Sequence, residues 1–364
     1  MKRFFNTLFA VLTFCFLGAN AAFASNGLEV HFLNVGQADA AFITCDGHSM
    51  LIDGGNSGDS QLIYSYLKNQ NVSFLDYIVA THDDADHVGG LSAAAAYAGP
   101  NIGQVFAPYT DSEKERFQTF KRKLSENGKT ITVPQTGTSY DLGGAKFQIL
   151  AGVGTGKNAS IVLRLTYGEH SFLFMGDAEA EQEKAILDRG SAVESTVLKV
   201  GHHGSNTSTC YQFLRAVYPK YAVVSVGKDN TYGHPTDEVL SRLRDCGTSV
   251  FRTDNNGTII FKSDGKQLSY TSEKPVDFAV NLVAAGTVQT LGTNQDQKGS
   301  ETAVETNKNA SGARTYVLNT NTHKFHVPGC SSVSQMKEKN KRTVEDSRDS
   351  IISQGYEPCK RCNP

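Results

Sequence analysis

The sequence predicts an α/β layered fold with helices covering both sheets, followed by a small separate module. Two observations support this prediction. Residues 28–272 alternate between strand-like and helix-like stretches, and several apolar strands run directly into polar loops. Beyond residue 292 the composition changes to Gly, Thr, Asn, Gln, Ser and charged residues, before a cysteine-containing stretch that ends the chain.

The elements follow from periodicity. Alternating apolar residues predict a strand over 28–35, and the next two apolar runs predict a hairpin that continues it. An amphipathic pattern predicts a helix over 61–70, and an Ala-rich stretch predicts another over 89–98. The remaining apolar runs, each ending in a polar loop, predict strands within 74–82, 170–177, 195–205 and 221–227.

Composition and charge limit the function classes. The chain has 364 residues, 39% hydrophobic and 20% charged, and 35 Lys and Arg against 37 Asp and Glu give a formal net charge of −2. Such a chain does not bind nucleic acid by bulk charge, so a polyanion must be held by a local patch or by metal. No apolar run after the N-terminus reaches the roughly 18 residues that cross a bilayer, so no membrane span is predicted.

The N-terminus resembles a secretory signal peptide over residues 1–24. Lys2 and Arg3 precede a mostly apolar run, and Ala22 and Ala24 form a small-x-small cleavage site. We therefore expect cleavage after Ala24 and a secreted, extracellular protein. A retained anchor is the alternative.

The segment THDDADHVGG carries the strongest chemical pattern. His82, Asp84, Asp86 and His87 follow an apolar strand at positions i, i+2, i+4 and i+5. A tight loop can turn these side chains toward one point, where they form a set of metal ligands. The alternative is a solvated polar turn.

Three further segments place polar side chains at the ends of strands. Asp53 lies in LIDGG, Asp177 in MGD, and His202 and His203 in GHHGS. Each turn alone is common. Their joint occurrence favours a metal site at one edge of the sheets.

Together with LNVGQADAAFI and YGHP, these motifs resemble the metallo-β-lactamase superfamily, specifically the hydrolase domain of ComEC-type DNA-uptake proteins, here over residues 25–273. The resemblance implies an αββα sandwich with a dinuclear metal site. His82 and Asp84 would hold one metal, Asp86 and His87 the other, and Asp177 would bridge them.

The same resemblance implies that His202 or His203 completes the second metal. We expect His202, because it directly follows the strand and its glycine. Asp53 would orient the ligand loop. Asp84 stands where the superfamily commonly has His, and a further usual His is missing. The first site is therefore oxygen-rich, which favours Mn²⁺, with Zn²⁺ also open.

Two such divalent ions, Mn or Zn, would activate water and neutralise charge developing on a phosphodiester. The resemblance thus gives Asp86, Asp177 and Asp53 catalytic roles. The expected substrate contacts are Asn158, Ser160, Ser205, Lys228 and His234.

A flexible linker is expected over 274–314, followed by a module over 315–364. His326 and Cys330 have H-x3-C spacing, and Cys359 and Cys362 have C-x2-C spacing, as in a structural zinc site. A disulfide between Cys359 and Cys362 is the alternative. Among the remaining cysteines, Cys210 and Cys246 are one possible pair.

The module resembles the small zinc module of the Ada DNA-repair protein, with a histidine replacing one cysteine. The resemblance implies DNA binding. The module has 8 Lys and Arg against 5 Asp and Glu, and the basic residues expected to contribute are Lys337, Lys339, Lys341 and Arg342.

The sequence therefore favours an exported metal-dependent phosphodiesterase, a nuclease with extracellular DNA as substrate. One alternative is a hydrolase of another cell-surface phosphodiester, such as teichoic-acid phosphocholine. Others are a β-lactamase-like hydrolase and, in a different class, a non-catalytic DNA-binding protein with structural metals. No protein partner is indicated.

Overall fold

The computed structural model describes residues 27–152, 159–284 and 314–364, except 329, 360–361 and 363. The expected signal peptide, Asn158 and residues 285–313 of the expected linker lie outside the described residues. In the described part of the chain, no helix has the length and apolar character needed to span a membrane.

The first sheet has the strand order β15-β14-β1-β2-β3-β4-β5-β6. In its central strands, apolar residues either alternate with polar ones or follow one another without interruption. Val30 and Phe32 of β1 and Ile43 of β2 are fully buried. The strands are β1 (Leu28–Phe32), β2 (Ala41–Cys45), β3 (His48–Ile52), β4 (Leu75–Val79), β5 (Ile102–Phe106), β6 (Ile131–Thr132), β14 (Ile259–Ser263) and β15 (Leu268–Ser272).

The second sheet has the order β13-β12-β11-β10-β9-β8-β7. Its strands are β7 (Ser139–Leu142), β8 (Ala145–Ala151), β9 (Val162–Tyr167), β10 (His170–Phe174), β11 (Val197–Lys199), β12 (Tyr221–Val224) and β13 (Ser249–Arg252).

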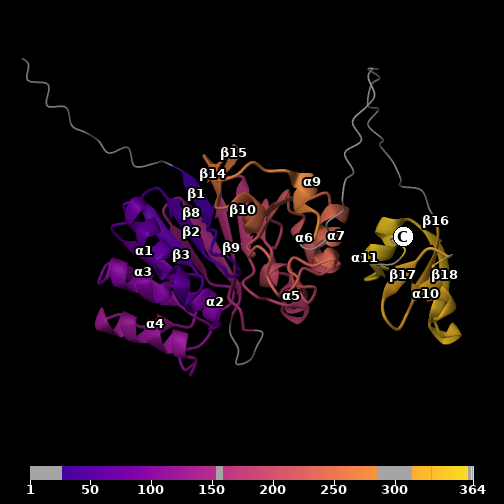
Figure 1. The fold of residues 1–364 in the computed structure, drawn as a ribbon, viewed down its shortest axis with the longest axis horizontal. Coiled ribbons are helices and arrows are strands. Elements are labelled where there is room, and N and C mark those ends of the chain that lie inside the picture. Colours follow the sequence, from indigo (N-terminus) through magenta and orange to yellow (C-terminus); the bar gives the residue numbers. More distant parts are fainter. Residues whose placement is uncertain (1–26, 153–158, 285–313, 329, 360–361, 363) are drawn as a thin grey trace, which may run out of the picture.

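Helices cover the outer face of each sheet (Figure 1). On the first sheet lie α1 (Ser60–Asn69), α3 (Leu91–Ala98) and α4 (Glu115–Glu126), with the short η1 (Ser57–Asp59) and α2 (Ala85–Val88) near the sheet edge. On the second lie α5 (Ala180–Asp188), α6 (Tyr211–Val217) and α7 (Asp237–Asp245). The short η2 (Gly201–Gly204), α8 (Thr253–Asn256) and α9 (Phe278–Asn281) complete the domain. The αββα sandwich is confirmed.

Three apolar cores match these layers. One lies between the sheets and includes Phe32, Phe174 and Phe261, and the other two lie between each sheet and its helices. Phe32 and Phe174 come from different sheets and stack with ring centroids 5.8 Å apart. This contact joins the sheets near the edge where the metal motifs lie.

Strand register brings the motifs to that edge. β3 pairs in parallel with β4, with Ile52 opposite Val79, and β10 pairs in parallel with β11, with Phe174 opposite Lys199. The carboxyl ends of parallel strands meet at one edge of a sheet. The loops that follow these four strands carry Asp53, the THDDADH segment, Asp177 and the GHHG turn.

The hydrolase domain extends beyond the predicted boundary. The linker prediction started at residue 274, but Phe278 of α9 packs edge-on against Phe251 at 5.2 Å, and Asn281 is buried and donates to the Val250 carbonyl at 2.9 Å. Residues 276–284 (VDFAVNLVA) are mostly apolar, and the polar composition begins only at residue 292, so the linker prediction started before the change in composition.

The C-terminal module has a sheet of order β18-β16-β17-β19. Its elements are β16 (Arg314–Asn319), β17 (Lys324–His326), α10 (Ser331–Ser334), η3 (Glu338–Asn340), β18 (Lys341–Asp346), α11 (Arg348–Ser353) and β19 (Glu357–Pro358). The module contacts the second helical layer near α6 (Figure 1).

Phe261 gives a direct test of the inter-sheet core. Its ring is fully buried and packs against Phe32, Phe172 and Phe251. We expect Phe261→Ala to lower the free energy of unfolding by about 3–5 kcal/mol, because it leaves a cavity between the sheets. Denaturant unfolding measures this. Phe74→Ala is the control, because that ring is 45% exposed and should cost less than about 0.5 kcal/mol. Equal effects would contradict the assigned core.

Candidate metal centre

The THDDADH loop turns alternate side chains toward the site. His82 Nε2 lies 3.5 Å from Asp84 Oδ2 and 3.7 Å from Asp177 Oδ2. Asp83, between them, points away and binds Lys114 Nζ at 2.6 Å. The loop then continues into α2, where the His87 amide donates to the Asp84 carbonyl at 3.0 Å.

A second group lies on the other oxygen of Asp177. His87 Nε2 is 3.3 Å from Asp177 Oδ1, and His203 Nε2 is 3.8 Å from the same oxygen. Asp86 Oδ2 lies 3.2 Å from His203 Nε2. The ligand atoms of His82, His87 and Asp177 lie within 4.8 Å of one another, as do those of Asp86, His87 and His203. Asp177 thus directs one oxygen to each group, as a ligand that bridges two ions requires.

Asp53 fixes the orientation of His87. Its Oδ2 accepts a hydrogen bond from His87 Nδ1 at 2.8 Å, and its two oxygens also accept from the Thr81 amide and hydroxyl. All three residues are buried. With Nδ1 donating to the carboxylate, the Nε2 lone pair of His87 faces the site.

Asp39 does the same for His203, and the sequence analysis missed it. His203 Nδ1 donates to the Ser225 carbonyl at 3.0 Å and lies 3.3 Å from Asp39 Oδ1. Asp39 is in turn paired with the buried Lys199 at 2.8 Å. The sequence did carry a signal, since Asp39 lies in the apolar stretch QADAAF and Lys199 in the apolar stretch VLKV. Charged side chains are seldom fully buried unless they are paired, so two such residues could have been expected to pair.

The two neighbouring histidines differ in their surroundings. His202 is about one-third exposed, with Nε2 3.6 Å from Asp177 Oδ2 and Nδ1 3.3 Å from Glu179. His203 is buried and faces Asp86. The geometry therefore assigns the second group to His203, in contrast to the expectation for His202, which lies beside the first group.

The local backbone explains this outcome. Both histidines lie in η2 with positive φ, 50° at His202 and 53° at His203. Two consecutive left-handed residues reverse the chain direction. His202, the first histidine after the strand, is therefore not the one that points into the site, and His203 is. Such conformations cost on the order of 1–3 kcal/mol each and persist only where the surroundings enforce them.

The donor set fits divalent metal ions. Among the described residues, the buried atoms His82 Nε2, His87 Nε2 and Asp177 Oδ1 have no hydrogen-bond partner, although all three face the same space. Unpaired buried polar atoms are costly, so a ligand is expected there. Imidazole and carboxylate together suit Zn²⁺, Mn²⁺ and related ions.

Electrostatics agree with a cation at this place. Burial disfavours charge on both groups, yet the carboxylate of Asp39 raises the pKa of His203 to about 10, and the imidazole of His87 holds the pKa of Asp177 well below its usual range. Protons on the histidines thus balance the carboxylates. Divalent ions would take over that positive charge.

The expected substrate contacts lie around the site in different ways. Ser160 is buried and its Oγ accepts from the Asp177 amide at 3.1 Å, so it positions that loop. His234 lies 5.8 Å from His202, ring to ring, and Ser205 follows η2. Lys228 is exposed on the loop after β12.

Lys114 is a further residue that the sequence analysis did not single out. Its ammonium group contacts Asp84 Oδ1 as well as Asp83, and its side chain is half exposed. A cation thus lies at the rim of the first group, supplied by the loop before α4.

The module brings its four expected ligands together. Ligand atoms of His326, Cys330, Cys359 and Cys362 lie within 4.8 Å of one another, with the sulfurs of Cys330 and Cys359 4.0 Å apart. Sulfur ligands about 2.3 Å from a tetrahedral zinc lie about 3.8 Å apart. These cysteines form no disulfide, nor do Cys210 and Cys246 with each other. The buried Nδ1 of His326 has no hydrogen-bond partner among the described residues, so the cluster fits one zinc ion.

Comparison with known proteins identifies the family. A family model described as the metallo-beta-lactamase superfamily matches residues 33–228. That is more than half of the chain, and the chain therefore belongs to the metallo-β-lactamase superfamily. Membership indicates a metal-dependent hydrolase that uses divalent metal ions.

Its relatives include competence proteins. The chain is 28% identical over 272 residues to ComE operon protein 3 of Bacillus subtilis, covering 68% of this chain and 35% of that protein. It is 32% identical over 244 residues to Competence protein ComA of Neisseria gonorrhoeae, covering 66% and 33%. The chain thus spans about a third of these relatives' length.

Among solved structures, YhfI of Bacillus subtilis, a metallo-beta-lactamase fold protein, matches with 11% identity and a TM-score of 0.47, covering 65% of this chain and all of YhfI.

The roles of the two histidines can be separated by counting metal. We expect His203→Ala to reduce bound metal from three equivalents, two in the hydrolase domain and one in the module, to about two, because His203 is the buried partner of Asp86. His202→Ala should retain three. Elemental analysis after loading and gel filtration measures both. The reverse result, loss only in His202→Ala, would restore the assignment expected from the sequence.

The module should depend on zinc for folding. Ordering costs about 1.5 kcal/mol per residue against little apolar area, whereas a structural zinc contributes on the order of 10 kcal/mol. Residues 315–364 expressed alone should bind one Zn²⁺ and lose their circular dichroism signal when a chelator removes it. Cys362→Ser should abolish stoichiometric binding. A metal-free module with unchanged spectra would contradict the zinc site.

Proposed function

We propose that the protein is an exported metal-dependent phosphodiesterase that acts as a nuclease on extracellular DNA. The observation that carries the proposal is the geometry of Asp177, whose two oxygens face two separate groups of metal ligands. Two ions held there would supply an activated water and neutralise charge on a phosphodiester during in-line attack.

The chain's own residues have distinct tasks in this reaction. Asp53 and Asp39 orient His87 and His203, and Ser160 positions the Asp177 loop. Lys114, which contacts Asp84, and Lys228, which is exposed on the loop after β12, would contact an anionic substrate. No protein nucleophile is needed for such a reaction.

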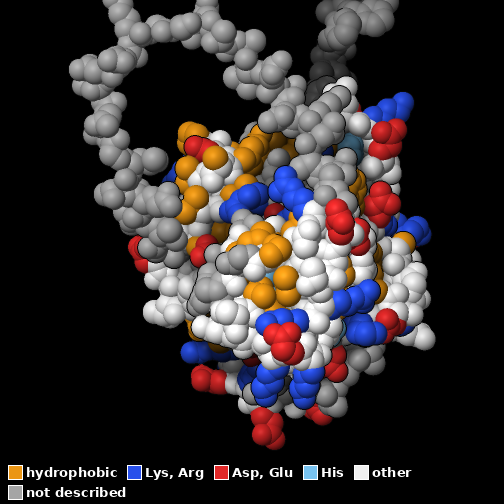
Figure 2. Space-filling view, turned by 90° about the vertical axis from the view of Figure 1, so that its right-hand side faces the viewer, with side chains coloured by type: hydrophobic (Ala, Val, Ile, Leu, Met, Phe, Trp, Pro, Cys, Tyr) orange, Lys and Arg blue, Asp and Glu red, His pale blue; other side chains and the backbone are white. Residues whose placement is uncertain are grey.

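Two considerations support DNA as the substrate. Relatives of the chain carry names that refer to competence and recombination. The module, which resembles a DNA-repair zinc module, presents basic side chains, although on the face shown in Figure 2 these are interspersed with Asp and Glu. The module would therefore contribute local phosphate contacts rather than a continuous basic surface.

The dinuclear assignment has a simple kinetic test. Asp177→Ala should reduce hydrolysis of bis-p-nitrophenyl phosphate to below about a tenth, a loss above about 1.4 kcal/mol in transition-state stabilisation. The fold should persist, as judged by circular dichroism. Asp141→Ala is the matched control, because that carboxylate is exposed and pairs with Lys146 on the surface. Retention of more than a tenth of the activity would exclude Asp177 as the bridging ligand.

The same preparation separates the substrate classes. Activity on single- or double-stranded DNA supports the nuclease proposal. Activity found only on choline-bearing wall polymer, or only on a β-lactam, would contradict the nuclease proposal and support the corresponding alternative. Two metal ions bound in the hydrolase domain without hydrolysis of any of these substrates would favour a DNA-binding protein with structural metals. Detection of a chain starting at Ser25 in the culture medium tests export.

A further inference from the structure

One loop, residues 204–210, connects the candidate metal centre to the C-terminal module. It begins directly after His203, which faces Asp86, and ends at Tyr211, the first residue of α6. Tyr211 is only 5% exposed, and it belongs to an apolar cluster whose other members all come from the module: Tyr316, Leu318, Phe325, Ile351, Ile352 and Tyr356.

Two buried side chains hold this loop. Arg242 of α7 donates from Nη1 to the carbonyls of Ser208 and Thr209, at 2.9 and 3.3 Å. Glu183 of α5 accepts from the amides of Thr209 and Cys210. Ser208 in turn donates to the Gly201 carbonyl at 2.8 Å. The restraint therefore reaches the turn that contains the two histidines.

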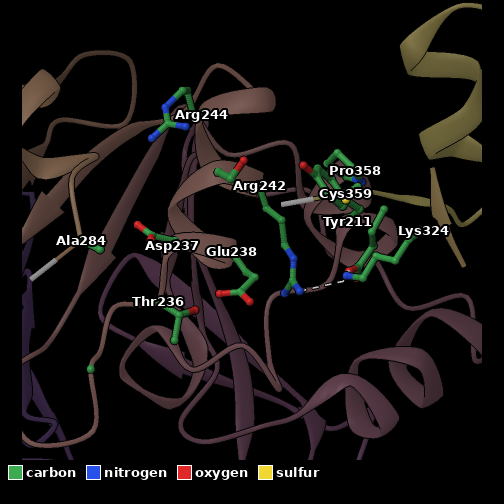
Figure 3. Close-up of a pocket in the computed structure, with 13 residues that line it drawn as sticks. Tyr211, Thr236, Asp237, Glu238, Arg242, Arg244, Ala284, Lys324, Pro358 and Cys359 are labelled. Carbon is green, nitrogen blue, oxygen red and sulfur yellow. Dashed lines mark hydrogen bonds and ion pairs between the residues drawn. The ribbon is translucent and has the colours of Figure 1, made fainter. Parts of the chain in front are cut away.

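Arg242 is also paired with the module. Its Nη2 lies 3.5 Å from Glu357 Oε1, and Lys324 holds the other oxygen of Glu357 at 2.5 Å. Figure 3 shows the Arg242 side chain extending from α7 toward the module strands, along a cavity of about 530 Å³ between the two domains. Because Arg242 is 6% exposed, loss of the Glu357 carboxylate would remove one of the negative charges that compensate the buried guanidinium.

The zinc ligands lie directly beside this ion pair. In the parallel pair of β17 and β19, Lys324 is opposite Glu357 and Phe325 is opposite Pro358. The next residue along each segment is a candidate zinc ligand, His326 at the end of β17 and Cys359 directly after β19, and the Cys359 amide donates to the Phe325 carbonyl at 2.8 Å. A zinc ion held by these ligands would fix the two segments that present Glu357 to Arg242.

A second ion pair completes the interface. Arg348 of α11 binds Asp245 at 2.8 Å, and Asp245 also accepts the hydroxyl of Tyr211. Both pairs thus attach the module to α7 and to the end of the loop. The left-handed conformations of His202 and His203 need such restraint from their surroundings.

We infer that Arg242 is a positioning residue through which the zinc-loaded module holds the loop that follows His203. The module then supports the second metal position from outside the hydrolase domain. The inference does not depend on which substrate is cleaved.

The test uses the full-length protein with both kinds of metal site loaded. Glu357→Gln removes one charge from the interface, and Glu345→Gln on the exposed edge strand β18 is the matched control. We expect the amides of Ser205, Ser208, Thr209 and Cys210 to exchange hydrogen at least about fivefold faster in Glu357→Gln only. Affinity for the second metal should fall in the same variant, and Glu357→Asp should restore part of both.

Cys359→Ser, which removes a zinc ligand, should reproduce the faster exchange in residues 205–210. Exchange and second-metal affinity equal to those of Glu345→Gln would overturn the inference. Faster exchange spread over the whole hydrolase domain would also overturn it, because that result means general destabilisation rather than positioning of one loop.

Discussion

The metal centre depends on one repeated interaction, a buried imidazole whose Nδ1 faces a buried carboxylate. Asp53 orients His87 and Asp39 orients His203 in this way, and both pairs leave Nε2 facing Asp177. Burying these acids is unfavourable unless each charge is compensated. Lys199 compensates Asp39, and the amide and hydroxyl of Thr81 bind Asp53.

These imidazole–carboxylate pairs also explain why the metal-binding edges of the two sheets lie next to each other. Asp39 and Asp53 come from segments of the first sheet, whereas His203 and Asp177 follow strands of the second. The Thr81 carbonyl accepts the amide of Ile161 at 2.8 Å, which ties the ligand loop to the opposite sheet. The αββα arrangement and the site therefore require one another, since the first sheet supplies His82 and His87 without the bridging carboxylate, and the second supplies Asp177 and His203 without the carboxylate of Asp39.

Most of the fold and the set of ligand types could be predicted, because periodicity and motif spacing are local properties. The choice between His202 and His203 could not, since it depends on two left-handed residues that no propensity indicates. Asp39 and Lys199 are 160 positions apart in the numbering, so their pairing is visible only after the sheets assemble. The domain boundary was misplaced although composition could have shown it, because the mostly apolar stretch 276–284, which includes Phe278 and packs on the domain, precedes the polar run that begins at residue 292.

The oxygen-rich first group has a compensation of its own. Where the superfamily commonly has a neutral imidazole, Asp84 adds a negative charge, and Lys114 places a positive charge on its outer oxygen. The other oxygen of Asp84 faces His82. The ion pair between Asp84 and Lys114 keeps the net charge at the rim of the first group close to that of a neutral imidazole. The donor atom changes from nitrogen to oxygen. We propose that metal preference at this position is determined by donor hardness rather than by added charge, in which case the hard carboxylate of Asp84 would favour ions such as Mn²⁺ over those that prefer imidazole.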